Sequence, residues 1–278
     1  MTIRPVHGLI LAGGASQRMQ RDKAALEYQG KTQLQRAFEL ASRHVGQVFV
    51  SLRAEQTSDP TRAHLPMIVD LAGGRGPIVG IRSALAAHPE AAWLVLACDL
   101  PFLSDAAIEE LLRRRDPNAL ATAYRSAHDG LPEPLCAIWE PAAARVLAEY
   151  QAAGGTCPRK FLIRHGAHLL DLPDPRTLDN VNTPEEYSQA VAALETMAPM
   201  QLKIQYYALM REQAGRSEET LETSAATPAD LYAELTARYG FTLSREQLKV
   251  AVNSEFSEWS RKLAANDAVV FIPPVAGG

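Results

Sequence analysis

Short apolar runs alternate with amphipathic stretches along the chain from Val6 to about Leu194. Strands that alternate with helices in this way are typical of βαβ units, in which helices cover both faces of a mainly parallel sheet. The expected strands are Val6–Leu11, Val48–Leu52, Met67–Val69, Trp93–Ala97, Ala119–Ala123 and Leu135–Trp139, and the expected helices are Gln33–Arg43, Pro77–Ala87, Ala106–Arg115 and Ala142–Ala152. This pattern predicts an α/β domain of the Rossmann-like type.

The last helix of this part has a clear beginning. Thr183 is expected to be its N-cap, Pro184 its first helical residue and Glu186 the partner that completes a capping box. The helix then meets Ala198-Pro199, where the proline disfavours helical geometry in the residue before it. We therefore expect a domain boundary here, with a first domain at residues 1–196.

A different pattern begins at about residue 200. The segment QLKIQYYAL has the period of two that is typical of a half-buried strand, and Met200 has the appearance of a former start codon. The expected elements of this second domain, residues 200–278, are the strands Leu202–Ala208, Thr220–Glu222, Lys249–Val252 and Val269–Ile272, and a helix from Thr227-Pro228 to Gly240. A small α+β domain is the predicted result.

Composition narrows the class of protein. A chain of 278 residues with 47% hydrophobic content can bury a substantial core. Its net charge of −4 and the lack of a Lys/Arg-rich run argue against a nucleic-acid partner. Cys98, Cys136 and Cys157 form no C-x-x-C pair, which fits a reduced intracellular protein, with Cys98 in the core. No segment reaches the ~20 apolar residues that span a bilayer, so we expect a cytoplasmic protein without a membrane partner.

The segment LILAGGASQRMQRDK, Leu9–Lys23, suggests a phosphate site. Gly13 and Gly14 follow an expected strand, and glycines there allow successive N–H groups to point at one anion. Arg18 and Lys23 add positive charge. A turn with solvated basic residues would also explain a glycine pair, so the signal rests on the whole string rather than on the pair.

Two other glycine-containing segments imitate nucleotide motifs. Gly30–Thr32 resembles the end of a P-loop, but Ala25 stands where that motif needs its first glycine, so a turn before a helix is expected. Gly74–Gly80 resembles a dinucleotide fingerprint with Asp99 about 20 residues later. That fingerprint should open the first βαβ unit, whereas this one lies in the middle of the domain.

Two carboxylates and two amides lie at the ends of expected elements. Asp99 and Asp70 each follow a strand, at the edge where α/β sheets bind ligands. Mg²⁺ is typically held by one or two carboxylates, phosphate oxygens and water, although a turn-capping role explains either residue equally well by pattern alone. Asn180 and Asn182 precede the last helix and suit its entry turn.

Four motifs in this order resemble the molybdenum cofactor guanylyltransferases, within the wider nucleotidyltransferase fold: LAGGASQRMQRDKAAL, VDLAGGRGPIVGIRSAL, LACDLP and LDNVNTPEEY. The resemblance covers nearly all of residues 5–195. Two positions depart from the family pattern, since Gln20 stands where a glycine is usual and Ser51 where asparagine is expected near the nucleotide.

The resemblance implies transfer of GMP from GTP to molybdopterin, with release of pyrophosphate and with Mg²⁺ as the metal. It implies Asp99 as the metal ligand, Lys23 and Arg18 as phosphate contacts with Asp99 in the catalytic set, and Asn180 and Asn182 on the pterin side. The nucleotide-binding residues that it implies are Leu11, Ala12, Gly13, Gly14, Lys23, Ser51, Asp70 and Asp99. A CTP-dependent cytidylyltransferase and a sugar-phosphate nucleotidyltransferase are the alternatives.

The chain ends in FIPPVAGG. A Gly-Gly end has a chance probability of order one in 200, and a carboxylate on glycine can enter a narrow active site because no Cβ obstructs it. Pro273-Pro274 would hold such a tail extended, although a frayed tail is the simpler explanation.

Residues 200–278 resemble the small subunit of molybdopterin synthase, a ubiquitin-like β-grasp sulfur carrier, in QLKIQYYALMREQAG, VAVNSEF and AANDAVVFIPPVAGG. The resemblance implies adenylation by an E1-like enzyme and a thiocarboxylate at Gly278, preceded by Gly277. The implied partners are that enzyme and the large synthase subunit, with molybdenum-insertion proteins and molybdoenzyme chaperones as further partners. The alternative is a docking or protein-modifier module without sulfur chemistry.

Overall fold

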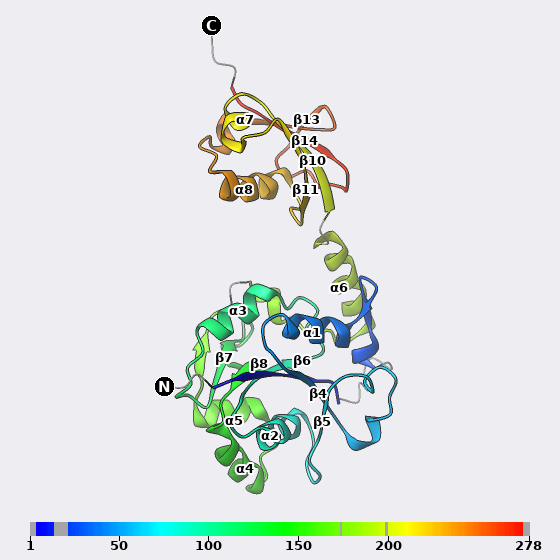
Figure 1. Ribbon diagram of the computed structural model, residues 1–278, viewed down its shortest axis with the longest axis vertical. Coiled ribbons are helices and arrows are strands. Elements are labelled where there is room, and N and C mark those ends of the chain that lie inside the picture. The colour runs from blue at the N-terminus through cyan, green and yellow to red at the C-terminus, as the bar shows by residue number, and fades with distance from the viewer. Residues whose placement is uncertain (1–3, 14–21, 173, 198–199, 275–278) are drawn as a thin grey trace. The chain divides into compact units, whose positions relative to one another are not determined.

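The computed structural model describes residues 4–13, 22–172, 174–197 and 200–274. The chain packs as two units, residues 1–191 and 192–278 (Figure 1). The division falls inside the helix α6, Pro184–Met197. None of the helices among the described residues is both long enough and apolar enough to cross a membrane.

The first unit is built on a seven-stranded sheet with the order β5-β4-β1-β6-β8-β7-β9. All neighbouring pairs are parallel except those that β8 makes with β6 and β7. The strands are β1 Val6–Leu11, β4 Val48–Leu52, β5 Met67–Val69, β6 Ala92–Ala97, β7 Ala121–Arg125, β8 Pro132–Trp139 and β9 His168–Leu170. The predicted mainly parallel sheet is confirmed, and β9 is the strand that the sequence pattern did not indicate.

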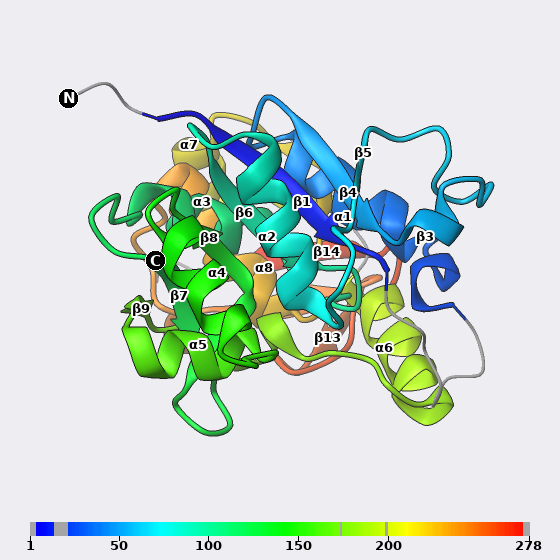
Figure 2. The same cartoon turned by 90° about the horizontal axis from the view of Figure 1, so that it is seen from below.

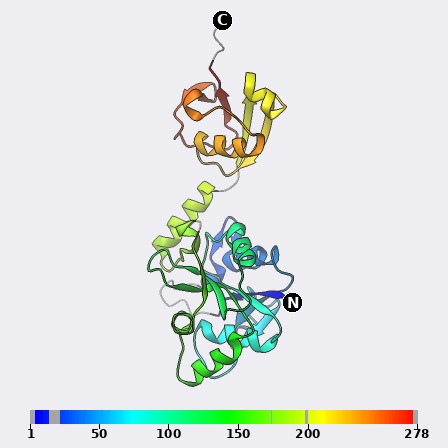
Figure 3. The same cartoon turned by 90° about the vertical axis from the view of Figure 1, so that its left-hand side faces the viewer.

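Helices cover both faces of this sheet (Figures 1 and 3). On one face α1 and α3 pack against strand residues such as Ile10 and Leu94. On the other face, which is turned toward the viewer in Figure 2, α2, α4 and α5 pack against residues such as Leu9 and Trp93. The helices are α1 Gln33–Ser42, α2 Pro77–Ala87, α3 Asp105–Arg113, α4 Ala143–Ala152 and α5 Pro158–His165. Because neighbouring residues of a strand point to opposite faces, both layers share the same strands.

Local signals in the sequence explain where several elements begin. The capping box of α6 is confirmed, because the Glu186 amide donates to Thr183 Oγ1 over 3.2 Å and the Thr183 amide donates to Glu186 Oε2. The P-loop imitation is a turn, with Gly30 at φ 76° between the short strands β2 Glu27–Tyr28 and β3 Lys31–Thr32.

The second unit contains a five-stranded sheet with the order β11-β10-β14-β12-β13. The pair β10–β14 is parallel, and the other neighbours are antiparallel. Its elements are β10 Met200–Tyr206, α7 Ala208–Ala214, β11 Glu218–Thr223, α8 Pro228–Tyr239, β12 Lys249–Val252, β13 Glu255–Ser257 and β14 Ala268–Ile272. The core joins Leu202 and Ile204 of the first strand to Leu231 of α8 and Phe271 of the last strand. This is the predicted α+β β-grasp arrangement.

Several strand boundaries in the second unit differ from their predictions by one or two residues, and the end of β10 has a local cause. The strand expected to reach Ala208 ends at Tyr206, because Ala208 has φ 46° and begins α7. The predicted end of α8 is confirmed, since Gly240 takes the left-handed conformation, with φ 70°, at the helix C-cap.

Candidate active site

A cavity of about 1030 Å³ lies at the carboxyl ends of β1, β4, β5 and β6. The segments after these strands, a short turn near residue 22 and the residue before α6 form its walls. The polar and glycine residues that line it include Gly13, Asp22, Lys23, Ser51, Arg53, Glu55, Asp70, Gly74, Arg75, Gly76, Asp99 and Asn182. This is the edge at which α/β sheets bind ligands.

Lys23 is held between two other predicted site residues. Its Nζ donates to Asp99 Oδ2 over 2.8 Å and to Asn182 Oδ1 over 2.6 Å. Asn182 in turn donates from Nδ2 to Asn180 Oδ1 over 3.0 Å. An ammonium has three N–H donors, so these contacts are compatible with a further one to an anionic ligand. The structure thus brings together side chains from three segments that are far apart in the sequence.

Asp22 and Asp99 both line the cavity beside Lys23, but their oxygens are used differently. Asp22 accepts from the Ala24 amide at Oδ1 and from Arg62 Nη2 at Oδ2, over 3.0 and 2.6 Å. Asp22 is therefore the N-cap of the 3₁₀ turn Lys23–Ala25 and part of an ion pair. Asp99 is the carboxylate better placed to hold a ligand cation.

The donor set fits a metal that arrives with a nucleotide. Within the described ranges, no group of three or more His, Cys, Asp or Glu side chains is arranged to hold a metal ion. Mg²⁺ needs only one or two protein carboxylates when phosphates and waters complete its shell. Asp99, with its side chain 21% exposed to the cavity, supplies such a carboxylate.

Ser51 and Asp70 form a second polar pair in the cavity wall. The Ser51 hydroxyl donates to Asp70 Oδ1 over 2.7 Å. Burial raises the pKa of Asp70 from its usual value, and the hydrogen bond from Ser51 and the charge of Arg53 act in the opposite direction. A Cβ at Gly80 would lie 2.3 Å from Ser51 Oγ, so a glycine at this position of α2 is what allows the helix to approach the pair.

The segment between β5 and α2 belongs to the cavity. Gly76, with φ 80°, is the N-cap of α2 and Pro77 its first residue, which is a favoured start for a helix. The dinucleotide-like string Gly74–Gly80 thus follows the edge strand β5 and forms the start of α2, and it does not open the first βαβ unit. Arg75 of this segment and Arg53 after β4 also line the cavity, and the sequence analysis missed both. Each follows an expected strand, which is the position at which site residues are expected in such sheets.

The predicted nucleotide and pterin residues within the described ranges meet at this one cavity. It is lined by Leu11, Ala12, Gly13, Lys23, Ser51, Asp70, Asp99 and Asn182, and Asn180 contacts the last of these. Gly14, Arg18, Gln20, Gly277 and Gly278 lie outside the described residues. Cys98 is buried as predicted, and burial raises the pKa of its thiol to about 12.

Arg62 and Asp59 are two further residues near the cavity that the sequence analysis did not select. The guanidinium of Arg62 bonds Asp22 and the Ala12 carbonyl, which are 40 and 50 residues away in the chain. Such a distant contact leaves no periodic or motif signal in the sequence.

Comparison with known proteins agrees with this geometry. Residues 8–169 match the family described as MobA-like NTP transferase domain, and residues 204–278 match the ThiS family. The chain is 36% identical over 185 residues to a molybdenum cofactor biosynthesis bifunctional protein of Synechocystis sp.; the match covers 66% of this chain and spans 53% of the relative's length.

Two further proteins are similar over most of their own length. A probable molybdenum cofactor guanylyltransferase of Trichormus variabilis is 30% identical over 194 residues, which cover 69% of this chain and 93% of that protein. The crystal structure of molybdopterin-guanine dinucleotide biosynthesis protein A from Archaeoglobus fulgidus has the same fold, with a TM-score of 0.57 and 24% identity over 69% of this chain and 100% of that one. This chain belongs to the MobA-like NTP transferase family, is a nucleotidyltransferase, and carries a ThiS family domain at its C-terminal end.

Proposed function

We propose that residues 1–196 transfer GMP from GTP to molybdopterin and release pyrophosphate. The observation that carries the proposal is the placement of Lys23 between Asp99 and Asn182, in the cavity that Gly13 and Asp70 also line. A cation, a carboxylate and a glycine backbone in one cavity suit a triphosphate with its metal. The names of the relatives supply the identity of the nucleotide and the acceptor.

The transfer needs no protein nucleophile. An oxygen of the terminal phosphate of molybdopterin forms the new bond to the α-phosphorus of GTP, and the bond from that phosphorus to the β-phosphate bridging oxygen breaks as pyrophosphate leaves. Such reactions depend on positioning and on neutralising charge. The protein therefore has to hold two anionic substrates in line and keep water away from the phosphorus.

Each site residue has a role in this proposal. Asp99 would hold Mg²⁺, which neutralises phosphate charge when bound, and Lys23 would contact the phosphate oxygens on which charge develops. Gly13, with Gly14 and Arg18 from the adjoining sequence, would bind phosphate. On the nucleoside side, the remaining contacts would come from Leu11, Ala12, Ser51 and Asp70. On the pterin side they would come from Asn180 and Asn182.

Steady-state rates with GTP, CTP and sugar phosphates test this function. We expect transfer to molybdopterin with GTP as the preferred nucleotide and with a requirement for Mg²⁺. A clear preference for CTP, or transfer to a sugar phosphate instead of the pterin, would replace the guanylyltransferase assignment with one of its alternatives.

We further propose that residues 200–278 act as a sulfur carrier whose C-terminal glycine becomes a thiocarboxylate. The match of residues 204–278 to the ThiS family and the terminal Gly277-Gly278 favour this role. An E1-like enzyme would adenylate the Gly278 carboxylate with ATP, releasing pyrophosphate, and sulfur would then displace AMP. The large subunit of molybdopterin synthase would receive the sulfur, and molybdenum-insertion proteins and molybdoenzyme chaperones would act later.

Intact mass of the chain purified from its own cells tests the carrier role. A full-length chain in which sulfur has replaced one terminal oxygen supports one bifunctional protein. Fragments that meet near Met200 would show that the two domains work as separate proteins. A full-length chain that takes up no sulfur from the activating enzyme, ATP and a sulfur donor would favour a docking module.

A further inference from the structure

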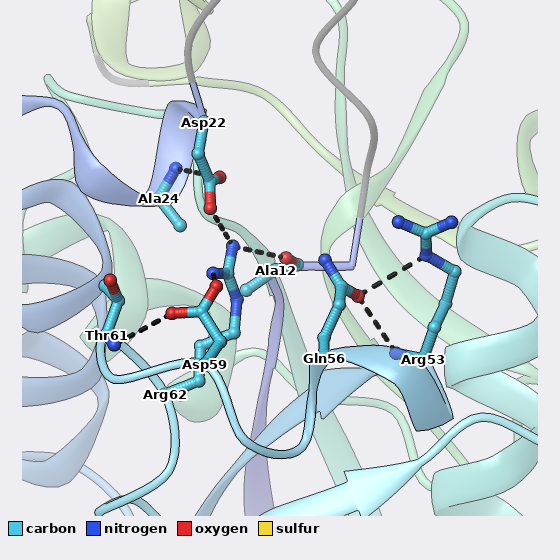
Figure 4. Close-up of polar contacts among 8 residues, drawn as sticks. All are labelled: Ala12, Asp22, Ala24, Arg53, Gln56, Asp59, Thr61 and Arg62. Carbon is cyan, nitrogen blue, oxygen red and sulfur yellow. Dashed lines mark hydrogen bonds and ion pairs between the residues drawn. The ribbon is translucent and has the colours of Figure 1, made fainter.

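Arg62 is a fully buried arginine beside the cavity, with its side chain 0% exposed. It lies in the loop between β4 and β5, and Figure 4 shows its guanidinium surrounded by Asp22, Asp59 and the carbonyl of Ala12. A buried guanidinium is costly unless its charge is paired and its donors are hydrogen-bonded; here Nη1 and Nη2 have partners, whereas Nε has none. The identity of those partners suggests what the residue does.

One nitrogen of Arg62 joins the two flanks of the glycine segment. Nη2 donates to the Ala12 carbonyl over 3.0 Å and to Asp22 Oδ2 over 2.6 Å. Ala12 immediately precedes Gly13, and Asp22 immediately precedes Lys23. The guanidinium therefore ties the residue before the anion-binding glycine to the residue before the lysine, within one hydrogen-bonded unit.

A second carboxylate fixes the guanidinium from the other side. Nη1 donates to Asp59 Oδ2 over 2.6 Å, and the other oxygen of Asp59 accepts from the Thr61 amide over 2.8 Å. The backbone carbonyl of Asp59 accepts from the Arg62 and Ala63 amides. Asp59 thus closes the turn that carries Arg62 and orients its side chain at the same time.

The chemistry of these contacts selects arginine over lysine. A guanidinium is a rigid planar fork that reaches two directions at fixed angles, whereas an ammonium is a single point of charge on a flexible stem. Arg62 also offsets the charge of Asp22, which lines the cavity. Without that partner, Asp22 would present its charge to an incoming triphosphate and repel it.

We propose that Arg62 is a positioning residue for the nucleotidyl transfer: by tying Ala12 to Asp22 it sets the spacing between the Gly13 backbone and the Lys23 ammonium. The inference rests on the proposed function for its kinetic consequence and on the structure for its contacts. Displacement of a catalytic group by about 1 Å is enough to cost on the order of 10²-fold in rate.

The same unit offers a matched control. Arg115 is largely buried, with its side chain 10% exposed, and it donates to one carboxylate and one backbone carbonyl: Glu140, over 2.6 and 2.9 Å, and Arg4, over 3.1 Å. Arg4 precedes β1 and Glu140 follows β8, so this cluster lies at the end of the sheet away from the cavity. A purely structural role predicts the same consequences for both arginines.

The test compares Arg62→Met, Arg62→Lys and Arg115→Met in the full chain, below the unfolding temperature of each variant. We expect Arg62→Met to lower kcat/KM for GMP transfer by about 10²-fold, with KM for GTP raised and kcat lowered. Arg62→Lys should recover part of this loss, because it restores the charge without the fork. Arg115→Met should lower stability and leave kcat and KM within about twofold. Wild-type kinetics in Arg62→Met, or an equal loss in Arg115→Met, would overturn the proposal.

A second measurement needs no substrate. Amide hydrogen exchange of residues 22–28 should accelerate in Arg62→Met and stay unchanged in Arg115→Met, because only the first variant releases Asp22 from the guanidinium. If the wild-type protein fails to transfer GMP, the proposed function is wrong, but hydrogen exchange still tests whether Arg62 links Ala12 to Asp22. If Arg62→Met does not fold, Asp59→Asn provides the same comparison with a smaller expected effect; unchanged exchange there would overturn the inference.

Discussion

The two units use their sheets in opposite ways. In the first unit every residue of β6 is buried, because helices cover both faces of the sheet. In the second unit β10 alternates between buried Leu202 and Ile204 and exposed Gln201 and Lys203, because both helices serve one core. A mainly parallel sheet that is buried on both faces leaves the ends of its strands for ligand binding. The sheet of the second unit is covered on one face only, and the function proposed for that unit lies at the end of the chain.

This difference determines how each unit is expected to fail. Function in the first unit is proposed to depend on side chains from distant segments, such as Lys23, Asp99 and Asn182, which meet within hydrogen-bonding distance. Function in the second unit is proposed to depend on the terminal glycines and on a folded domain behind them. Point substitutions at the cavity should therefore damage the first unit, and loss of the chain end or of the core should damage the second.

Removal of Gly277 and Gly278 should produce the largest effect. Without the two glycines the terminal carboxylate belongs to Ala276, which is two residues short and carries a Cβ that a narrow active site would exclude, so molybdopterin synthesis that depends on this chain should stop completely. GMP transfer to added molybdopterin should keep its wild-type rate. The measurements are molybdopterin content in cells that rely on this chain and GMP transfer by the purified variant; normal content would favour the docking role.

Substitutions of Lys23 and Asp99 by alanine should give the next largest effect. Loss of one preorganised charge contact at a transition state typically costs about 10²–10³-fold in kcat, and we expect Asp99→Ala also to abolish the dependence of the rate on Mg²⁺. Circular dichroism checks that both variants stay folded, and sulfur loading of the second unit provides the control. A normal rate in Asp99→Ala would refute its assignment as the metal ligand.

Substitution of Phe271 by alanine should lower the thermal stability of the second unit and leave that of the first unit unchanged. Phe271 is fully buried and stacks on Trp259, with ring centroids 5.7 Å apart, and truncation of a buried phenylalanine costs about 3–5 kcal/mol. We expect scanning calorimetry to show a lowered transition for the second unit and unchanged GMP transfer. The matched variant Phe161→Ala, in a core of the first unit, should show the reverse; a single shared transition in both variants would mean that the units unfold together.

Much of the fold and of the candidate site could be predicted from the sequence, because the signals for these features lie in neighbouring residues of the chain. Apolar runs located six strands of the first sheet, and capping residues such as Thr183 located helix starts. Asp99 and Asp70 each follow an expected strand and belong to motifs that carry the family resemblance, and both line the same cavity. Features that depend on neighbouring residues of the chain can therefore be recognised without a structure.

Features that depend on distant contacts could not be predicted in this way. The helix α7 was missed because it begins at Ala208, which has a positive φ that alanine rarely adopts. Strand β9, His168–Leu170, is as short as β5 but lacks the β-branched residues of the β5 segment Met67–Val69, so the sequence did not indicate a strand there. Arg62 belongs to no recognisable motif. Its proposed role rests on hydrogen bonds to Ala12 and Asp22, which are distant in the sequence and close only in the folded chain.

The smallest effect that we predict concerns pH. All seven histidines lie in residues 1–191, so histidine titration should alter the stability of the first unit alone. Burial lowers the pKa of His7 from its usual 6.5; the charge of His88, whose ring centroid is 5.2 Å away, acts in the same direction, and Glu90 acts against both.

Because the folded pKa of His7 lies below the unfolded one, protonation costs more in the folded state. Its contribution to stability is present above pH 6.5 and is lost as the pH falls through 6.5 toward the folded pKa. Between pH 7.5 and about 5.5 we expect the Tm of the first unit to decline by a few degrees at most, since 1 kcal/mol corresponds to about 2–4 °C in a domain of this size. His7→Phe should flatten this decline and the exposed-site variant His64→Gln should not; an equal pH response in the second unit would trace the effect to groups other than histidine.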